Sequence, residues 1–258
     1  MGSCMKLAVL NQKGGVGKTT VSVNLAYGFA HEGKRTLLVD LDPQAHSTII
    51  YSSPPKKPEA TVKDLLLSKT SDIRKAIIPA SVNGQPVNGL FLIASNIHLA
   101  ITAEQIIAST HREKLLHNHF KKIEKDFDFI VMDCPPTLNV LTVNAIYTAD
   151  LILIPTTYSV NALDGIADLF KSVSDVKESE DFAFLIVRNG YDARNKDSNR
   201  FIEENLEPYR QYVLKTVIRR IEAINQAPMN REPIFTFDPT SRGTEDFQAL
   251  TSELIVYA

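Results

Sequence analysis

The sequence predicts an α/β fold in which helices cover both faces of a mostly parallel, twisted sheet. Short runs of Val, Ile and Leu alternate with segments of helical periodicity, which is typical of buried parallel strands joined by helices. Acidic residues close two of these runs, and ligands of such sheets lie at the carboxyl ends of the strands. A glycine-rich turn separates the first strand from the first helix, which is typical of an anion-binding site.

The individual elements follow from apolar runs and from turn and capping residues. Thr61 and Ser198 are expected to cap helices, Gly33 to end the first helix, and the region from Asn83 to Gly89 to form turns. A proline- and lysine-rich surface loop is expected at Ser52–Pro58. The predicted strands are Leu7–Leu10, Thr36–Asp40, Leu90–Ile93, Phe129–Asp133, Leu151–Pro155, Phe182–Val187 and Val213–Val217. The predicted helices are Thr19–His31, Thr61–Leu67, Leu99–Ala108, Arg112–Lys125, Thr142–Thr148, Ala162–Val176, Ser198–Gln211 and Thr244–Leu254.

The bulk composition excludes several classes of protein. The 258 residues are 44% hydrophobic and 22% charged, as in an ordinary globular protein. A formal net charge of −2 gives no global attraction to nucleic acid or membrane, so such binding would need a local patch. Cys4 and Cys134 cannot build a disulfide framework or a metal site of their own, which suits a reducing cytoplasm. No run of about 18 apolar residues is present, so we expect a cytoplasmic protein without a membrane span.

The chain is expected to form one domain. No internal repeat, low-complexity tract or break in composition divides it, and a single α/β domain of this length is common. Met1–Cys4 precede a second methionine, Met5, and are interpreted as added residues or an alternative start. The predicted domain therefore spans residues 5–258.

The glycine-rich turn predicts a phosphate-binding loop. Glycines let backbone N–H groups converge on phosphate oxygens, because no Cβ stands in the way. Lys18 would place its charge at the outer phosphates, and the Thr19 hydroxyl is of the type that binds Mg²⁺. The general P-loop pattern wants a glycine where Gln12 stands, and this chain has a second lysine, Lys13, beside it. The full stretch reads Asn11-Gln12-Lys13-Gly14-Gly15-Val16-Gly17-Lys18-Thr19-Thr20.

This stretch resembles the deviant Walker A motif of the ParA/MinD family of ATPases. The resemblance implies a P-loop NTPase fold and a single ATPase domain that uses ATP and Mg²⁺. In that family the first lysine, here Lys13, reaches across a dimer interface to the partner's nucleotide. The resemblance assigns nucleotide contacts to Lys13, Gly14, Gly15, Val16, Gly17, Lys18, Thr19 and Thr20.

Carboxylates at the strand ends complete the expected chemistry. Asp133 ends an apolar strand and is interpreted as a Walker B residue that holds Mg²⁺ through water; a capping role in the next turn is the alternative. Asp40 and Asp42 lie two residues apart in a segment that resembles the family's Walker A-prime motif. By that resemblance Asp42 polarises the attacking water and Asp40 lies near the metal. A solvated acidic turn is the alternative, and it competes more strongly for Asp40 than for Asp42. Catalytic roles thus fall to Lys13, Lys18 and Asp42, and metal roles to Thr19, Asp40 and Asp133.

Three later segments extend the resemblance to short ParA/Soj-type partition ATPases over most of the chain. Cys134-Pro135-Pro136 resembles the switch II segment, with a rigid turn as the alternative. Asn189 and Pro239 stand in segments that resemble the family's adenine contacts, and ordinary loop structure explains them almost equally well. Members of this subfamily bind DNA without sequence preference, through arginines. Arg194 matches one such position; a second falls at Ala223, where Arg219 and Arg220 stand nearby, and a solvated role is the alternative for each.

The resemblance implies a DNA-partition ATPase that hydrolyses ATP to ADP and phosphate weakly, dimerises around ATP and associates with the nucleoid. A ParB-like centromere-binding partner would stimulate hydrolysis. A MinD-like membrane-positioning ATPase needs a basic C-terminal amphipathic helix, but residues 251–258 contain no Lys or Arg. A reductase like the nitrogenase iron protein needs cluster cysteines that are missing near Cys134. A scaffold that binds ATP without turnover and a positioner of cargo other than DNA remain as alternatives.

Overall fold

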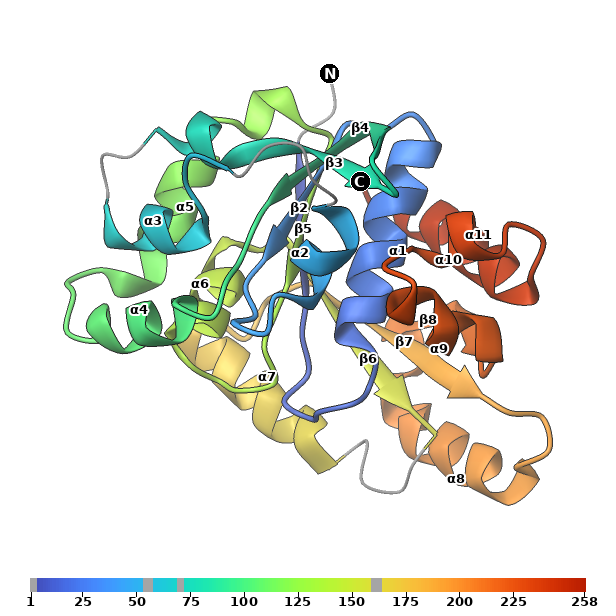
Figure 1. Ribbon diagram of the computed structural model, residues 1–258. Helices are drawn as coiled ribbons and strands as arrows, with labels where there is room; N and C mark the ends of the chain where they lie inside the picture. The colour runs from blue at the N-terminus through green and yellow to red at the C-terminus, as the bar shows by residue number, and fades with distance from the viewer. Residues whose placement is uncertain (1–3, 53–57, 69–71, 159–163) are drawn as a thin grey trace.

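A computed structural model of the chain describes residues 4–52, 58–68, 72–158 and 164–258. Eight strands form one sheet in the order β3-β4-β2-β5-β1-β6-β7-β8, with helices on both sides (Figure 1). Every neighbouring pair is parallel except β3 and β4. The predicted α/β class is therefore confirmed. The strands are β1 Met5–Val9, β2 Thr36–Asp40, β3 Ile77–Val82, β4 Gln85–Ile93, β5 Phe129–Asp133, β6 Leu151–Thr157, β7 Phe184–Tyr191 and β8 Val213–Arg219.

Two hydrophobic cores lie on opposite faces of the sheet. In β5, Ile130 and Met132 belong to one core, and Phe129 and Val131 belong to the other, because successive side chains of a strand alternate. The first core packs beneath α3 Val62–Leu67, α4 Leu99–Gln105, α5 Leu115–Phe120, α6 Val140–Thr148, α7 Asp164–Lys177 and α8 Lys196–Leu206. The second packs beneath α1 Lys18–His31, α2 His46–Tyr51, α9 Glu222–Met229, α10 Ile234–Phe237 and α11 Arg242–Ile255.

Most expected elements are confirmed, and the exceptions have local causes. Strand β3 was not predicted, because Pro79 lies within it; proline is tolerated there since β3 is an edge strand. Asn83 and Gly84 do form a turn, with φ of 50° and 78°, but β4 starts directly after it and includes Gly89. The prediction of turns through Gly89 was therefore wrong. Short helices α2, α9 and α10 were also missed.

Two helix predictions were wrong in detail. The segment Arg112–Lys125 is divided into a short 3-10 turn, helix α5 and another 3-10 turn. Ser198 is not a cap, because α8 already starts at Lys196. Helix α3 does begin after Thr61, whose backbone N–H donates to the Asp64 carboxylate at 2.7 Å. Most of the expected loop at Ser52–Pro58 and the first two residues of the expected helix at Ala162 lie outside the described residues.

The strand register brings the predicted acidic residues together. Asp133 pairs with Val9 in the β1–β5 ladder and with Asp40 in the β2–β5 ladder. Because these strands are parallel, their carboxyl ends meet at one edge of the sheet. The loop after β1 leads from this edge into α1, which crosses the middle of the view in Figure 1. This edge therefore holds the candidate site.

Candidate nucleotide-binding site

The loop between β1 and α1 has the backbone geometry of a phosphate cradle. Gly15 and Gly17 adopt φ of 75° and 90°, in the left-handed region that glycine tolerates best. Gly17 is also the residue before α1, so the free N–H groups of that helix point into the loop. Asn11 fixes the start of the loop: its amide donates to the Pro155 carbonyl at 2.8 Å and accepts from the Lys13 N–H at 2.9 Å.

Lys18 lies buried inside this loop. Its Nζ donates to the carbonyl oxygen of Lys13 at 3.0 Å, so the side chain folds back along the loop. Burial lowers the pKa of Lys18, while the charge of Asp133 acts in the opposite direction. A cation held in this way is positioned for an anion, because a phosphate would relieve the loss of hydration.

Gly17 also meets a residue from the other half of the sheet. Asn189, near the end of β7, donates its amide to the Val16 carbonyl at 2.8 Å. A Cβ built on Gly17 would lie 2.2 Å from the Asn189 Nδ2 atom. The contact of Asn189 with an adenine remains a prediction, since here its amide binds the phosphate loop itself.

We expect Gly17→Ala to distort the loop more than its backbone strain alone explains. The control is Gly33→Ala, because Gly33 has φ of 75° and no atom lies within 4 Å of its added Cβ. Gly33→Ala should cost about 1–2 kcal/mol of unfolding free energy and leave nucleotide binding intact. Gly17→Ala should lower the unfolding free energy further and weaken nucleotide binding. Adding Asn189→Ala to Gly17→Ala should restore part of the stability and part of the affinity. Urea unfolding and a fluorescent-nucleotide titration measure these effects; equal losses for the two glycines would contradict the close contact.

A pair of fully buried carboxylates lies behind the loop. Asp133 accepts from the Ser47 hydroxyl at 2.6 Å and from the Ser22 hydroxyl at 3.0 Å. Asp40 accepts from both the hydroxyl and the N–H of Thr48, at 2.7 and 2.8 Å. Burial raises the pKa of both acids, that of Asp40 to about 8 because the charge of Asp133 adds to the desolvation. The raised pKa values therefore favour a proton on Asp40 when no cation is bound.

This proton predicts a pH dependence of stability. Between pH of about 4 and 8 the folded chain keeps the proton on Asp40 that the unfolded chain releases. Because the folded state binds more protons, the unfolding free energy should fall as the pH rises through this range. Urea unfolding at pH 5.5 and 8.5 measures the effect. The Asp40→Asn variant, which cannot titrate, should show a flatter profile; an unchanged slope would contradict the shifted pKa.

Asp42 lies just outside this buried pair and is half-buried. Its carboxylate accepts from the Gln44 N–H at 2.9 Å, and its carbonyl accepts from the Ser95 hydroxyl at 2.8 Å. Its own N–H donates to Asp40 at 3.1 Å. The turn after β2 thus holds Asp42 at the mouth of the site while Asp40 is sealed inside.

Three of the residues predicted to contact the base or DNA, namely Asn189, Arg219 and Arg220, line one cavity. A cavity of about 410 Å³ beside the phosphate loop is lined by residues that include Gly15, Thr20, Asn189 and Arg220. Pro239, between α10 and α11, does not line it. Its predicted contact with the base remains untested.

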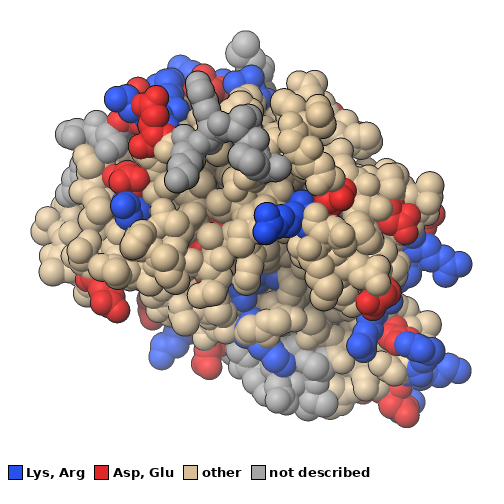
Figure 2. Space-filling model, viewed as in Figure 1, with Lys and Arg blue, Asp and Glu red and all other residues tan. Residues whose placement is uncertain are grey.

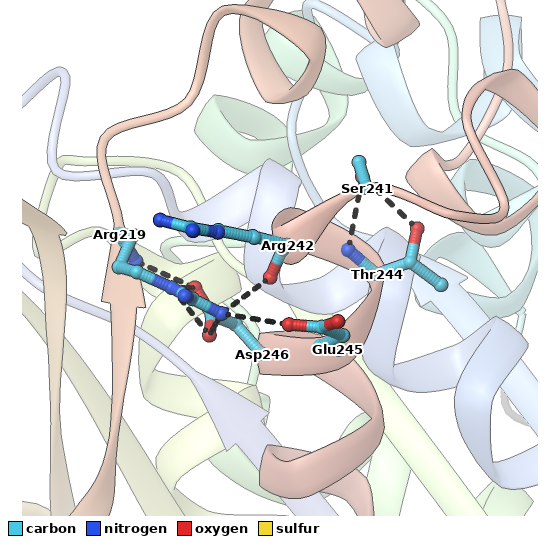
Figure 3. A network of polar contacts seen from close by, with 6 residues as sticks. All are labelled: Arg219, Ser241, Arg242, Thr244, Glu245 and Asp246. Carbon is cyan, nitrogen blue, oxygen red and sulfur yellow. Dashed lines mark hydrogen bonds and ion pairs between the residues drawn. The ribbon is translucent and has the colours of Figure 1, made fainter.

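Arg219 is committed to acidic partners (Figure 3). It binds Asp246 with its Nε and Nη2 atoms, the shortest contact being 2.6 Å, and Glu245 at 3.2 Å. It also donates to the Arg242 carbonyl at 3.0 Å. The structure thus ties the end of β8 to α11 through Arg219, and a DNA contact by this residue would require these bonds to break.

Arg194 is 87% exposed but forms a bidentate pair with Asp192, at distances down to 2.6 Å. Hydrogen bonds from Arg194 lower the pKa of Asp192 to about 2, and the charge of the exposed Arg220 acts in the same direction. One carboxylate thus lies near both arginines. In Figure 2, Lys and Arg are interspersed with Asp and Glu along the edge where α8, α9 and α11 lie.

Several residues of the site were not predicted from the sequence. Ser22, Ser47 and Thr48 supply the hydroxyls around the two buried acids, and Asn11 anchors the loop. Ser47 and Thr48 lie on helix α2, which the sequence did not signal because the residue before it, Ala45, has no side chain that could cap a helix. Within the described part of the chain no group of three or more His, Cys, Asp or Glu side chains is placed to hold a metal ion.

Comparison with known proteins fits this geometry. The sporulation initiation inhibitor protein Soj of Bacillus subtilis is 36% identical over 251 residues, which cover 96% of this chain and 97% of Soj. The chain belongs to the Soj/ParA-type ATPases. The chromosome-partitioning ATPase Soj of Treponema pallidum is 32% identical, with 96% of each chain covered. A family model described as an AAA domain matches residues 4–186.

A solved structure supports the same assignment for this Soj/ParA-type chain. Cobyrinic acid a,c-diamide synthase from Mycobacterium smegmatis, determined with a bound ATP analogue and magnesium, is 28% identical with a TM-score of 0.80. The alignment covers 98% of this chain and 94% of that one. The expected family and fold are thus confirmed. None of the helices in the described ranges is long and apolar enough to cross a membrane.

Proposed function

We propose that this chain is an ATP-dependent DNA-partition ATPase of the Soj/ParA type. One observation carries the proposal: the loop with two lysines leads into a helix whose Ser22 donates to Asp133, and Asp133 lies beside Asp40 at the strand ends. The names of the relatives support it, since one is a chromosome-partitioning ATPase. The ligands are ATP and Mg²⁺, as in the synthase structure, and the products are ADP and phosphate.

The residues divide the work of phosphoryl transfer. Loop N–H groups and Lys18 bind the phosphates, and the Lys18 ammonium leaves the Lys13 carbonyl to do so. Thr19, Asp40 and Asp133 would offer oxygen atoms to the cation, which suits Mg²⁺; Thr19 would hold it directly and Asp133 through water. The cation neutralises developing charge on the phosphates when bound. Asp42 orients the attacking water, and its position at the mouth of the site gives it access.

ATP joins two copies of the chain, with Lys13 of each subunit contacting the phosphates bound by the other. Lys13 lies at the start of the loop and is half-buried there. A ParB-like centromere-binding partner then stimulates hydrolysis, and the released subunits leave nucleoid DNA. We therefore expect the chain alone to hydrolyse ATP slowly, because the stimulation by the partner is then missing.

The C-terminal helix favours this function over attachment to a membrane surface. Helix α11 buries Phe247, Leu250 and Leu254 in a hydrophobic core, so its apolar face is already covered. Its last turn carries no basic residue. An interfacial helix needs a free apolar face flanked by Lys or Arg.

DNA binding is expected to depend on Arg194 and to be opposed by Asp192. Arg194→Ala removes one phosphate contact and should lower the slope of log K against log salt by about 1. Asp192→Asn should raise the affinity at low salt, because the arginine no longer has to break an ion pair. The matched controls are Arg200→Ala and Asp197→Asn, an exposed pair on α8 with a 3.1 Å contact. Fluorescence anisotropy with random-sequence DNA and Mg·ATP measures all four; equal effects of the two pairs would place the DNA surface elsewhere.

A further inference from the structure

A cluster of aromatic side chains lies at the surface, away from the nucleotide site. Phe170 of α7 contacts Phe184 of β7 at 4.4 Å and Tyr209 at 5.5 Å between ring centroids. Phe184 also contacts Tyr212 at 4.2 Å and Phe182 at 5.8 Å. These five rings, which we name the aromatic groove, line a depression of about 600 Å³.

The groove lies at the edge of the first hydrophobic core, and its rings are not fully buried. Four of the rings are only partly buried, and Tyr212 is 36% exposed. Phe182 and Phe184 lie at the amino end of β7, whereas Asn189 lies near its carboxyl end. Five residues at about 3.3 Å each separate Phe184 from Asn189 by roughly 16 Å. The groove is therefore distinct from the candidate nucleotide site, to which Asn189 belongs.

The rim of the groove is acidic. Asp175 and Glu180 line it, and Glu178 and Asp181 flank them in the turn after α7. All four are exposed, and none forms an ion pair with another residue in the ranges that the structure describes.

The basic residues nearby compensate for only part of this charge. Lys171 lines the groove, but the Lys177 Nζ is turned inward to the Ala149 carbonyl. On the opposite side Arg210 is paired with Glu207 at 3.2 Å. Net negative charge thus lies beside partly exposed aromatic rings, and both attract cations.

We propose that the aromatic groove binds a cationic peptide segment of a partner protein, with a Lys or Arg side chain held against the ring faces. Guanidinium and ammonium groups stack on aromatic faces, and the four carboxylates supply complementary charge. The backbone of an extended segment would follow the open depression between α7 and the Glu207–Tyr212 turn. This site does not depend on nucleotide, so its test is independent of the proposed function.

The test uses the full chain without nucleotide and a fluorescein-labelled Gly-Arg-Gly-Lys-Gly-Arg peptide at low salt. Fluorescence anisotropy should show binding, and a peptide with Glu in place of Arg and Lys should not bind. Tyr212→Ala should weaken binding about three- to fivefold, the loss expected for one exposed cation–π contact. Phe201→Ala, on α8 and 42% exposed, is the matched control and should have no effect.

Two further double variants distinguish the effect of the acidic residues at the groove from the effect of the net charge of the protein. Asp175→Asn with Glu180→Gln should weaken binding about tenfold, as expected for two exposed charge contacts. Glu104→Gln with Glu204→Gln changes the net charge equally and should leave binding unchanged. Equal losses for the two double variants, an unaltered affinity of Tyr212→Ala, or no binding to the wild-type chain would overturn the proposal. So would self-association of the nucleotide-free chain that Tyr212→Ala abolishes, because a second copy would then occupy the groove.

Discussion

Lys18→Ala is expected to lower the affinity for ATP by at least about 100-fold. The lysine would make charged hydrogen bonds to the outer phosphates, each contributing about 1.5–3 kcal/mol, and two of them correspond to this loss. The nucleotide-free fold should survive, because the substitution removes the side-chain hydrogen bond to the Lys13 carbonyl and a charge that burial disfavours. Isothermal titration calorimetry with Mg·ATP measures the change.

The control for this substitution is Lys75→Ala, which removes an exposed lysine outside the candidate nucleotide site. Its affinity for ATP should equal that of the wild-type protein. The thermal midpoint of Lys18→Ala without nucleotide should match the wild-type value or exceed it. Tight ATP binding by Lys18→Ala would show that the glycine-rich loop is not the phosphate site.

Asp42→Ala is expected to lower the rate of ATP hydrolysis by about 100-fold or more while ATP remains bound. A positioned side chain that orients or deprotonates the attacking group contributes about 10²–10⁴-fold. Binding should persist, because the carboxylate accepts its hydrogen bond from the Gln44 N–H in its own turn and not from the phosphate loop in the described residues. The trapped ATP state should then stay on DNA. Phosphate release and DNA co-sedimentation measure the two effects.

Asp72→Ala is the matched control for Asp42→Ala. Asp72 accepts from the N–H two residues ahead, that of Arg74 at 3.1 Å, in the same kind of turn but outside the site. Its removal should leave turnover unchanged. Normal turnover in Asp42→Ala would remove this residue from the mechanism and leave the two buried acids to explain hydrolysis.

The sequence predicted those parts of the site that depend on local pattern. The apolar run before Asp133 fixes a buried strand, and parallel pairing then brings its carboxyl end beside Asp40. The lysine-flanked glycines predicted the loop because the backbone conformation of a glycine-rich turn depends on the residues of the turn itself. The predicted nucleotide, metal and DNA roles of individual residues remain to be measured.

The parts that the sequence did not predict depend on long-range contacts. Asn189 reaches Val16 across 173 positions, and no local signal reports that contact. Arg219 was a candidate for DNA, but its partner Asp246 comes from α11, 27 positions later. Asp40 is also fully buried, which contradicts the alternative of a solvated acidic turn, because the Thr48 hydroxyl and the Asp133 strand enclose it.

The most direct test of the account is the mass of the Asp42→Ala chain by sedimentation velocity with saturating Mg·ATP. We predict a dimer with ATP, a monomer with ADP, and a monomer with ATP when Lys13→Ala is added. A chain that binds ATP yet remains monomeric under these conditions would contradict the claim that nucleotide joins two copies through Lys13.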